Sequence, residues 1–343
     1  MSRQERYGYR RSTKNVALLV CLGIVLLLCL IVGGYTLGRH YENKAYHEER
    51  QQMSENFGKL VTVTYNDKQY VRRPEVDTFL LMGVDRLDDE EPSGYRRGGQ
   101  ADFLLLIAID SKNKAVHQLQ IDRDSITDVP IVGVLGNDAG TRRMQVGLSH
   151  AYGSSEEDRC KHTVRAVANL LGGEKAQHYM SAMMNDIGVL NRTLGGITVT
   201  IPEDYSMEDP DMVKGAVLTL TDKQAEILVR ARMTIGDGTN ASRMERQRFF
   251  LSVVVDQVRA KLSQDADYAG NLINALEQMS GYTDYQHGQL VNLLNQIYQY
   301  DVLPVEILQG EYKVGTDGFT EFHVDENSAV EWVLQTLYEP NNN

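Results

Sequence analysis

A short stretch of the sequence, residues 229–250, concentrates positive charge in a chain of 343 residues whose formal net charge is −12. Guanidinium groups bind phosphate oxygens through two parallel hydrogen bonds, which a lysine cannot reproduce. On a helix, Arg243 and Gln247 are four residues apart and project from one face, near the helix's positive end. This pattern favours an anion site, and the alternative is a solvated basic helix face paired with the chain's many acids. The arginines of the stretch are Arg230, Arg232, Arg243, Arg246 and Arg248.

Two carboxylates and a further arginine follow or begin apolar runs elsewhere in the chain. Asp85 ends VDTFLLMGVD, Asp102 begins DFLLLIAID, and Arg123 and Asp124 come just after VHQLQI. Ligands bind at strand ends in open α/β sheets. Each aspartate alone could be a turn residue or a helix cap, and Arg123 with Asp124 a surface ion pair. If the two aspartates converge, they would instead form a metal site, with Arg123 as a phosphate ligand.

The elements that must position these residues are short strands alternating with helices. Nearly continuous apolar runs at 76–85 and 101–110 are typical of strands buried on both faces. This alternation predicts an α/β domain built in α-β-α layers. Further strands are predicted at 115–121, 196–201 and 304–309. Helices are predicted at 163–171, 180–194, 221–232, 243–262, 266–279, 285–298 and 327–337.

An uncharged run of about 22 residues, 16–37, precedes the predicted domain. As a helix it would extend roughly 33 Å, against roughly 30 Å of bilayer hydrocarbon. The basic residues before it place the N-terminus in the cytoplasm and the rest of the chain outside. The alternative, a cleaved signal peptide, usually has a shorter apolar region and an A-x-A site. We therefore expect a cytoplasmic tail at 1–15, a transmembrane helix at 16–37, a juxtamembrane stalk at 38–75 and an extracytoplasmic domain at 76–343.

Composition excludes several function classes. The part after Leu37 holds 30 basic and 46 acidic residues, a formal net charge of −16, which does not suit nucleic acid. Cys160 is the only cysteine outside the apolar run, so the external domain has no intramolecular disulfide. The histidines show no zinc-ligand spacing. His150 is expected to be packed or hydrogen-bonded rather than to act as a base.

Six motifs occur in the order and approximate spacing of a known family. They are LLMGVD, ADFLLLIAID, QIDRDS, LSHAYG, LGGITVTIP and LVRARMTIGDGTNASRMERQ. Over about residues 76–250 the chain resembles the LytR-CpsA-Psr family of Gram-positive cell-envelope enzymes. The resemblance implies a domain with a central mixed sheet behind one transmembrane helix in the cell membrane. It also implies an Mg²⁺-dependent phosphotransferase that moves a glycopolymer, such as teichoic acid or capsule, from a polyprenyl pyrophosphate carrier to peptidoglycan.

The resemblance assigns roles residue by residue. Asp85 and Asp102 correspond to the family's metal-site aspartates, and Arg246 lies within its R-x-x-R-Q segment. Two of the usual basic groups are missing, because Gln100 replaces an arginine and Gly147 a lysine. The residues implied to be catalytic are Arg123, Arg230, Arg232, Arg243 and Gln247. The other departures are Ala101 in place of a serine and Asp122 in place of a proline; Arg96 or Arg97 could compensate for the missing charge.

A polyprenyl tail needs an apolar groove, and the segment YMSAMMNDIGVLNRTL offers methionines and leucines at helical spacing. Flexible methionines suit an irregular, adaptable surface, although ordinary core packing is the alternative. The residues expected to bind substrate are Arg97, Gln100, Met180, Met184 and Arg246.

Two other functions stay open. Water could replace the peptidoglycan acceptor, which would make the chain a polyprenyl pyrophosphate hydrolase. The departures at Gln100 and Gly147 also leave room for a non-catalytic envelope sensor that binds the lipid head group. The aspartates and arginines that are retained favour the transferase.

Overall fold

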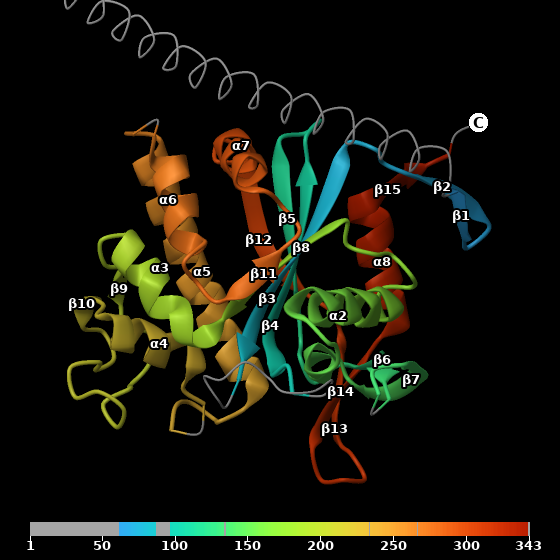
Figure 1. The fold of residues 1–343 in the computed structure, drawn as a ribbon, viewed down its shortest axis with the longest axis horizontal. Coiled ribbons are helices and arrows are strands. Elements are labelled where there is room, and N and C mark those ends of the chain that lie inside the picture. The colour runs from blue at the N-terminus through green and yellow to red at the C-terminus, as the bar shows by residue number, and fades with distance from the viewer. Residues whose placement is uncertain (1–61, 87–96, 134, 233, 266, 342–343) are drawn as a thin grey trace, which may run out of the picture. The chain divides into compact units, whose positions relative to one another are not determined.

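The computed structural model describes residues 62–86, 97–133, 135–232, 234–265 and 267–341 (Figure 1). All of them belong to one unit, Phe57–Asn343. The predicted cytoplasmic tail, the predicted transmembrane helix at 16–37 and most of the predicted stalk lie outside the described residues. Within the described ranges, no helix is both long enough and apolar enough to cross a membrane.

A six-stranded mixed sheet forms the centre of the unit, in the order β11-β8-β3-β4-β5-β12. β3 is antiparallel to β4 and parallel to β8, while β5 is antiparallel to β4 and parallel to β12. The apolar runs predicted as buried strands are indeed its central members. The bounds are β3 (Val76–Asp85), β4 (Gln100–Asp110), β5 (Ala115–Ile121), β8 (His178–Met183), β11 (Gly281–Thr283) and β12 (Asp301–Ile307).

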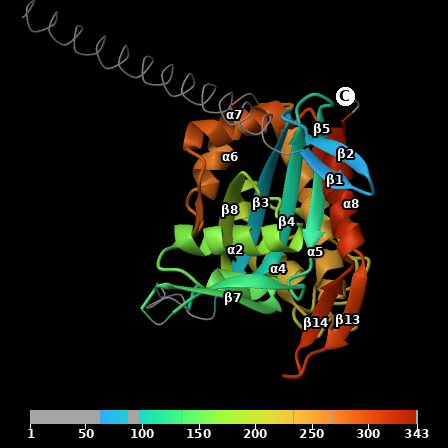
Figure 2. The ribbon, with the colours of Figure 1, turned by 90° about the vertical axis from the view of Figure 1, so that its right-hand side faces the viewer.

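Helices cover both faces of this sheet, as Figures 1 and 2 show. On one face, Leu80 and Leu104 pack in a core with Val164 of α2 and Trp332 of α8. On the other face, Phe103 packs against a second core that includes Phe250 of α5. The α/β class and the central mixed sheet are therefore confirmed. The helices are α2 (Glu156–Leu170), α3 (Ile187–Thr193), α4 (Asp222–Arg230), α5 (Asn240–Leu262), α6 (Tyr268–Leu276), α7 (His287–Ile297) and α8 (Glu326–Leu337), with short 3₁₀ helices η1 (Val146–Ala151) and η2 (Met184–Asp186).

Smaller sheets of two or three strands lie outside the central sheet. β2 pairs with β1 on one side and with β15 on the other, and Arg72 of β2 is buried. Part of the segment predicted as a juxtamembrane stalk thus forms two strands, β1 and β2, in the structure. The remaining pairs are β6 with β7, β9 with β10 and β13 with β14. The bounds are β1 (Thr62–Tyr65), β2 (Lys68–Arg72), β6 (Ile126–Val132), β7 (Asp138–Gln145), β9 (Thr198–Thr200), β10 (Val217–Thr219), β13 (Gly310–Val314), β14 (Thr320–Val324) and β15 (Tyr338–Pro340).

One predicted helix is wrong in its first half. Residues 178–183 form strand β8, which hydrogen-bonds between β3 and β11, and only 187–193 are α-helical. The spacing of the methionines suggested a helix, but pairing with two neighbouring strands decides the local structure. The strand predicted at 196–201 forms β9, outside the central sheet. The other six predicted helices are present, and α2 begins earlier, at Glu156.

Candidate active site

Antiparallel pairing of β3 and β4 places two carboxylates at the same end of the central sheet. Asp85, the last residue of β3, lies opposite Gln100. The register shifts between Gly83 and Val84, which leaves Asp102 as the extra residue of a β-bulge. Bulges re-aim side chains and occur often next to active sites. Asp102 therefore has no partner residue on β3, and its side chain is directed differently from that of a residue in a regular ladder.

Asp102 is only 7% exposed, and each of its oxygens faces an arginine. Its Oδ1 accepts a hydrogen bond from Nη1 of Arg123, the second residue after β5. Its Oδ2 accepts from Nη1 of Arg243 at 2.9 Å. Arg243 lies in the first turn of α5, which begins there because the Thr239 side chain caps it, accepting from the backbone of Ser242 at 3.2 Å.

The electrostatics of this cluster favour an additional negative group. Burial lowers the pKa of Arg243, and the guanidinium groups of Arg123 and Arg232 lower it further, against the opposing effect of Asp102. The Nε of Arg243 is buried without a hydrogen-bond acceptor among the described residues, whereas the Nε of Arg123 lies 3.3 Å from Asp124 Oδ1. Buried donors normally have partners. A phosphate oxygen would supply the acceptor that Arg243 Nε lacks.

Asp85 pairs with the arginine at the end of α4. Its Oδ1 accepts from Arg230 Nη2 at 2.8 Å, and both side chains are about one-third exposed. Arg230 also donates to Asn185 at 2.6 Å and to Glu226 on its own helix. This second ion pair is accessible to solvent, whereas the pairs of Asp102 are nearly enclosed.

A polar cavity of about 380 Å³ adjoins the arginine cluster. Arg123, Arg232, Gln100 and Gly147 line it, together with the tip of the β13–β14 hairpin. Arg232 is held by a hydrogen bond from its Nε to the backbone oxygen of Gly238 at 3.0 Å. Two predicted catalytic arginines and the predicted substrate residue Gln100 thus share one cavity.

The two departures in this cavity have different structural settings. Gln100 accepts a hydrogen bond from Arg123 Nη1 at 3.3 Å. Gly147 donates its backbone N–H to Arg123 O at 2.9 Å, so η1 packs closely against that segment. A Cβ at position 147 would lie 3.0 Å from the backbone oxygen of Ala101 and from Arg123 Cβ. A lysine there would require the neighbouring backbone to move.

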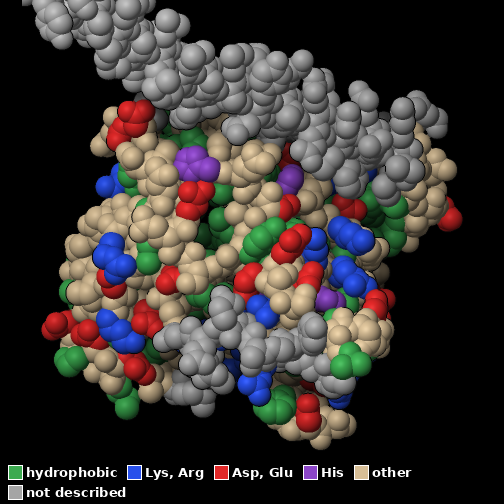
Figure 3. Space-filling view, viewed as in Figure 1, with side chains coloured by type: hydrophobic (Ala, Val, Ile, Leu, Met, Phe, Trp, Pro, Cys, Tyr) green, Lys and Arg blue, Asp and Glu red, His purple; other side chains and the backbone are tan. Residues whose placement is uncertain are grey.

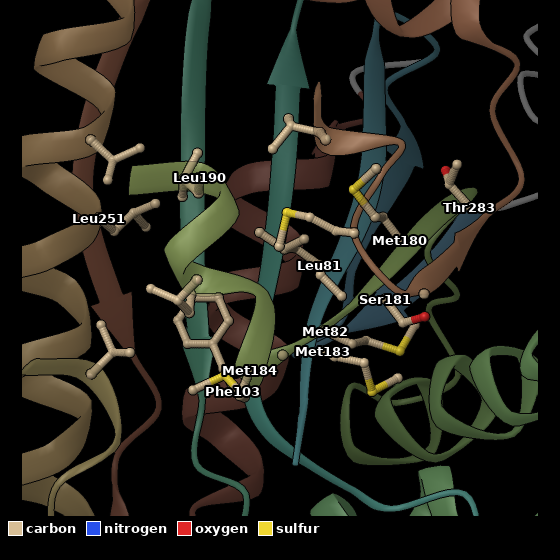
Figure 4. Close-up of a pocket in the computed structure, with 18 of the residues that line it drawn as sticks. Leu81, Met82, Phe103, Met180, Ser181, Met183, Met184, Leu190, Leu251 and Thr283 are labelled. Atoms are coloured by element: carbon tan, nitrogen blue, oxygen red, sulfur yellow. The ribbon is translucent and has the colours of Figure 1, made fainter. Parts of the chain in front are cut away.

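An apolar cavity of about 400 Å³ lies between the sheet and the helices α3, α5 and α6. Met180 of β8 and Met184 of η2 line it, as predicted for the lipid tail, although Met180 comes from a strand rather than a helix. Figure 4 shows Leu190 of α3 and Leu251 of α5 on the side opposite the sheet residue Leu81.

Gln247 lies where the apolar cavity meets the charged cluster. It lines the apolar cavity, and it is one helical turn from Arg243 on α5. Its Oε1 accepts from Gln120 Nε2 at 3.1 Å, and Gln120 Oε1 accepts from Arg248 at 2.7 Å. Arg243 and Gln247, predicted to share one face of a helix, therefore lie in the charged cluster and in the wall of the apolar cavity, respectively.

Two predicted substrate residues do not face either cavity. Arg246 is 1% exposed and donates to Ser242 Oγ at 2.7 Å and to the backbone oxygen of Ala231 at 2.8 Å. Its guanidinium group joins the loop after α4 to α5, which is a structural role in this conformation. Arg97 is exposed just before β4 and is not among the residues that line the cavities.

Sequence reasoning missed a chain of hydrogen bonds behind Arg243. Tyr312 of β13 donates to Asp122 Oδ2, and Asn240 donates to Asp122 Oδ1 at 2.7 Å. Asn240 Oδ1 in turn accepts from Arg243 Nη2 at 2.7 Å. Asp122, noted only as a departure from the family pattern, thus orients Arg243 through Asn240. The i, i+3 spacing of Asn240 and Arg243 was a visible signal, but nothing in the sequence indicated Tyr312.

His150 and Cys160 form a buried structural pair, as the sequence suggested for His150. Both are fully buried, and His150 Nδ1 is 3.2 Å from the backbone oxygen of Gly98. Burial lowers the pKa of His150 to about 4 and raises the pKa of the Cys160 thiol to about 12. A neutral imidazole and an un-ionised thiol leave this pair without nucleophilic character.

The donor set near the cluster fits a cation that is shared with a substrate. No group of three or more His, Cys, Asp or Glu side chains able to hold a metal occurs among the described residues. Asp85, the last residue of β3, and Asp102, the third residue of β4, nevertheless lie at the same end of adjacent strands. Mg²⁺ often takes one or two carboxylates and completes its shell with substrate phosphates and water. Two aspartates, without a larger set of protein ligands among the described residues, match this coordination.

Known proteins resemble this chain in fold and in sequence. Protein gbs0355 from Streptococcus agalactiae superposes with a TM-score of 0.63 at 18% identity, covering 78% of this chain and 90% of that one. Bacillus subtilis TagT bound to LI-WTA gives 0.57 at 18% identity, covering 81% and 99%. These likenesses show the fold alone.

A family model and a curated relative carry the comparison further. The polyisoprenyl-teichoic acid–peptidoglycan teichoic acid transferase TagU of Bacillus subtilis is 25% identical over 249 residues, 72% of each chain. The model of the LytR_cpsA_psr family matches residues 34–336. Because the family model matches most of its length, this chain belongs to the LytR-CpsA-Psr family.

Proposed function

We propose that this chain is a phosphotransferase that moves a glycopolymer from a polyprenyl pyrophosphate carrier to peptidoglycan. The observation that carries the proposal is the place of the arginine–aspartate cluster between two unlike cavities. Gln247 and Phe103 line the apolar cavity, while Arg123 and Arg232 line the polar one. A lipid-linked pyrophosphate has the same sequence of parts, an apolar tail followed by concentrated negative charge. The relationship to TagU, a named transferase, supports the reaction class.

The arginines would bind the pyrophosphate and meet the charge that develops during transfer. Phosphoryl transfer is accelerated mainly by positioning and by cations at the equatorial and leaving oxygens. Arg123 and Arg243 already point their guanidinium groups at one carboxylate, and the buried Nε of Arg243 lacks an acceptor within the described residues. Arg232 would add a third cation from the loop after α4, and Arg230 would steady Asp85.

Asp85 and Asp102 would hold Mg²⁺ together with phosphate oxygens. The ion would neutralise charge on the pyrophosphate and act as a Lewis acid on its oxygens. In the structure both carboxylates are paired with arginines, which keeps their charge compensated. Arg230 is the more exposed partner, so its pairing with Asp85 is the easier one to rearrange when a cation binds.

The apolar cavity would hold the first part of the polyprenyl chain. Its wall combines methionines from β8 and η2 with leucines from α3 and α5. Such a wall adapts to the shape of an irregular hydrocarbon chain. We also propose that the uncharged run at 16–37 anchors the chain in the cell membrane with the domain outside. There, tethering would hold the site at the leaflet that presents the donor.

The experiment is product analysis with the full chain purified in detergent. A synthetic polyprenyl pyrophosphate-linked saccharide is incubated with peptidoglycan fragments, with Mg²⁺ or with a chelator. We expect saccharide joined to peptidoglycan through a phosphodiester, with release of polyprenyl phosphate, only when Mg²⁺ is present. Release of polyprenyl phosphate with free saccharide phosphate would instead identify a hydrolase. Donor binding without any product would identify a non-catalytic binding protein.

A further inference from the structure

The tip of the β13–β14 hairpin presents an aromatic ring beside the polar cavity. Figures 1 and 2 show this hairpin projecting beyond the end of the central sheet. Phe319 is 66% exposed, yet it lines the cavity together with Asp317, Arg123 and Arg232. Exposing a large aromatic side chain in water is unfavourable, and such residues often mark binding sites. Neither the lipid tail nor the pyrophosphate of the proposed donor explains this ring.

The hairpin is fixed to the site rather than free to move as an isolated ribbon. Phe322 donates its backbone N–H to Asp124 O at 2.8 Å, and Gln145 donates to Thr320 O at 3.1 Å. Tyr312 packs against Phe322, with ring centroids 4.8 Å apart, and also donates to Asp122. These contacts join the base of the hairpin to the segment that carries Arg123.

The tip itself is shaped by a tight turn. Gly315 donates to Phe319 O at 2.8 Å, and the Asp317 side chain accepts from Phe319 N at 3.1 Å. Gly318 has a φ of +84°, a conformation that residues with a Cβ rarely adopt. The ring of Phe319 is therefore presented by an ordered turn. A pre-organised aromatic surface loses little conformational entropy when it binds a ligand.

The chemistry of the reaction says which substrate lies on this side. In phosphoryl transfer the attacking and leaving oxygens lie roughly in line through phosphorus. If the polyprenyl phosphate leaves toward the apolar cavity, the attacking hydroxyl must approach from the opposite side of the arginine cluster. The polar cavity shares no lining residue with the apolar one. It is the compartment from which an acceptor hydroxyl can reach the phosphorus.

We infer that the polar cavity is the acceptor site and that Phe319 stacks against a sugar ring of the peptidoglycan glycan strand. One face of an N-acetylhexosamine presents C–H groups, which pack on the negative face of an aromatic ring. Sugar hydroxyl and amide groups need donors and acceptors, which Gln145, Gln100 and Asp317 supply around the same cavity. This inference rests on the proposed transferase function, because the in-line argument assumes a lipid-linked donor.

The test compares variants of the full chain in detergent. The acceptor probe is a soluble β-1,4-linked N-acetylhexosamine oligosaccharide with peptidoglycan stem peptides. Phe319→Ala and Phe319→Leu should raise the acceptor KM roughly tenfold, since both remove the aromatic face, while Phe319→Trp should stay near wild type. Val314→Ala is the matched control, because Val314 is 78% exposed on the same hairpin and does not line the cavity.

Direct binding keeps the inference separate from the proposed function. Calorimetry should show oligosaccharide binding that Phe319→Ala weakens and Val314→Ala does not, and polyprenyl pyrophosphate binding that neither variant changes. If the wild type binds the oligosaccharide through Phe319 but transfers nothing, the acceptor site stands and the transferase proposal fails. Transfer with an unchanged acceptor KM and affinity in Phe319→Ala would overturn the acceptor site. Weaker donor binding in that variant would overturn it too, since the ring would then serve the donor.

Discussion

Replacing Arg243 distinguishes two possible roles of this side chain: binding phosphate, or only pairing with buried acceptors. Its side chain is 6% exposed and donates to Asp102 Oδ2 and Asn240 Oδ1. Arg243→Ala leaves Asp102 with Arg123 and leaves Asn240 Oδ1 without its donor. Losing these two hydrogen bonds should lower the free energy of unfolding by about 2 kcal/mol. Relief of repulsion from Arg123 and Arg232 would offset part of this loss.

The effect on transfer should be much larger than the effect on stability. Removing one donor from a preorganised anion site typically lowers turnover roughly 10²- to 10³-fold, so we expect that loss for Arg243→Ala. Arg243→Lys keeps the charge but not the paired geometry, and should lose roughly tenfold. The assay is transfer from a synthetic polyprenyl-linked donor to peptidoglycan fragments, with melting curves recorded on the same preparations.

Arg248→Ala is the matched control for this experiment. Arg248 lies on the same helix, is partly buried, and donates to Gln120 Oε1 at 2.7 Å. Its loss removes one hydrogen bond and should therefore reduce stability by about 1 kcal/mol, while leaving transfer within about threefold of wild type. Near-normal transfer by Arg243→Ala would refute the anion-site reasoning. So would equal losses of transfer in both variants, because stability alone would then account for them.

Three further predictions concern the carboxylates, the buried histidine and the lipid cavity. Asp85→Asn should abolish Mg²⁺-dependent transfer with little change in melting temperature, because its ion pair is partly exposed. Asp102→Asn should abolish transfer too and also lower the free energy of unfolding by about 3 kcal/mol, because Arg123 and Arg243 lose their charged partner. Mg²⁺ titration with calorimetry checks both variants. His150 stays neutral in the folded protein, so unfolding takes up a proton between pH 6.5 and about 4, and stability should fall by about 3 kcal/mol as pH falls through that window. Urea denaturation of His150→Asn should show a flatter profile there. Met180→Trp should raise KM for long-chain donors roughly tenfold but spare short-chain ones, with a stability loss below about 1.5 kcal/mol; equal KM changes for both donors would contradict a lipid cavity.

Local patterns were enough to predict the centre of the fold. The runs that became β3 and β4 are nearly continuously apolar, and this property can be read from consecutive residues. The segment 180–194 was misassigned because its methionines satisfy a helical period by coincidence. The strands that pair with its first part, β3 and β11, lie about 100 residues before and after it in the sequence. A local pattern holds no information about such partners.

The candidate site was predictable to the same degree. Arg123 and Arg243 could be chosen from spacing and resemblance, and the structure brings both to Asp102. Arg246 was expected beside them, but its guanidinium group instead donates a hydrogen bond to the backbone oxygen of Ala231. The bond from Tyr312 to Asp122 spans 190 residues, so no motif could have contained it. Residues that belong to a motif could be named from the sequence, whereas residues that contact the motif from distant parts of the chain could not.

The bulge at Asp102 has a consequence for how this chain tolerates deletions. Without the extra residue, Val76–Gly83 would still pair with Phe103–Asp110, and the regular ladder would simply continue toward Gln100. Losing one residue at this position would therefore spare the sheet and both cores while removing the carboxylate that holds two arginines. Loss of this one codon would therefore give a protein that keeps its sheet, is less stable by about the 3 kcal/mol expected for Asp102→Asn, and is inactive. Screens that score only expression or solubility would keep such a protein, and a screen for cell-wall attachment would discard it.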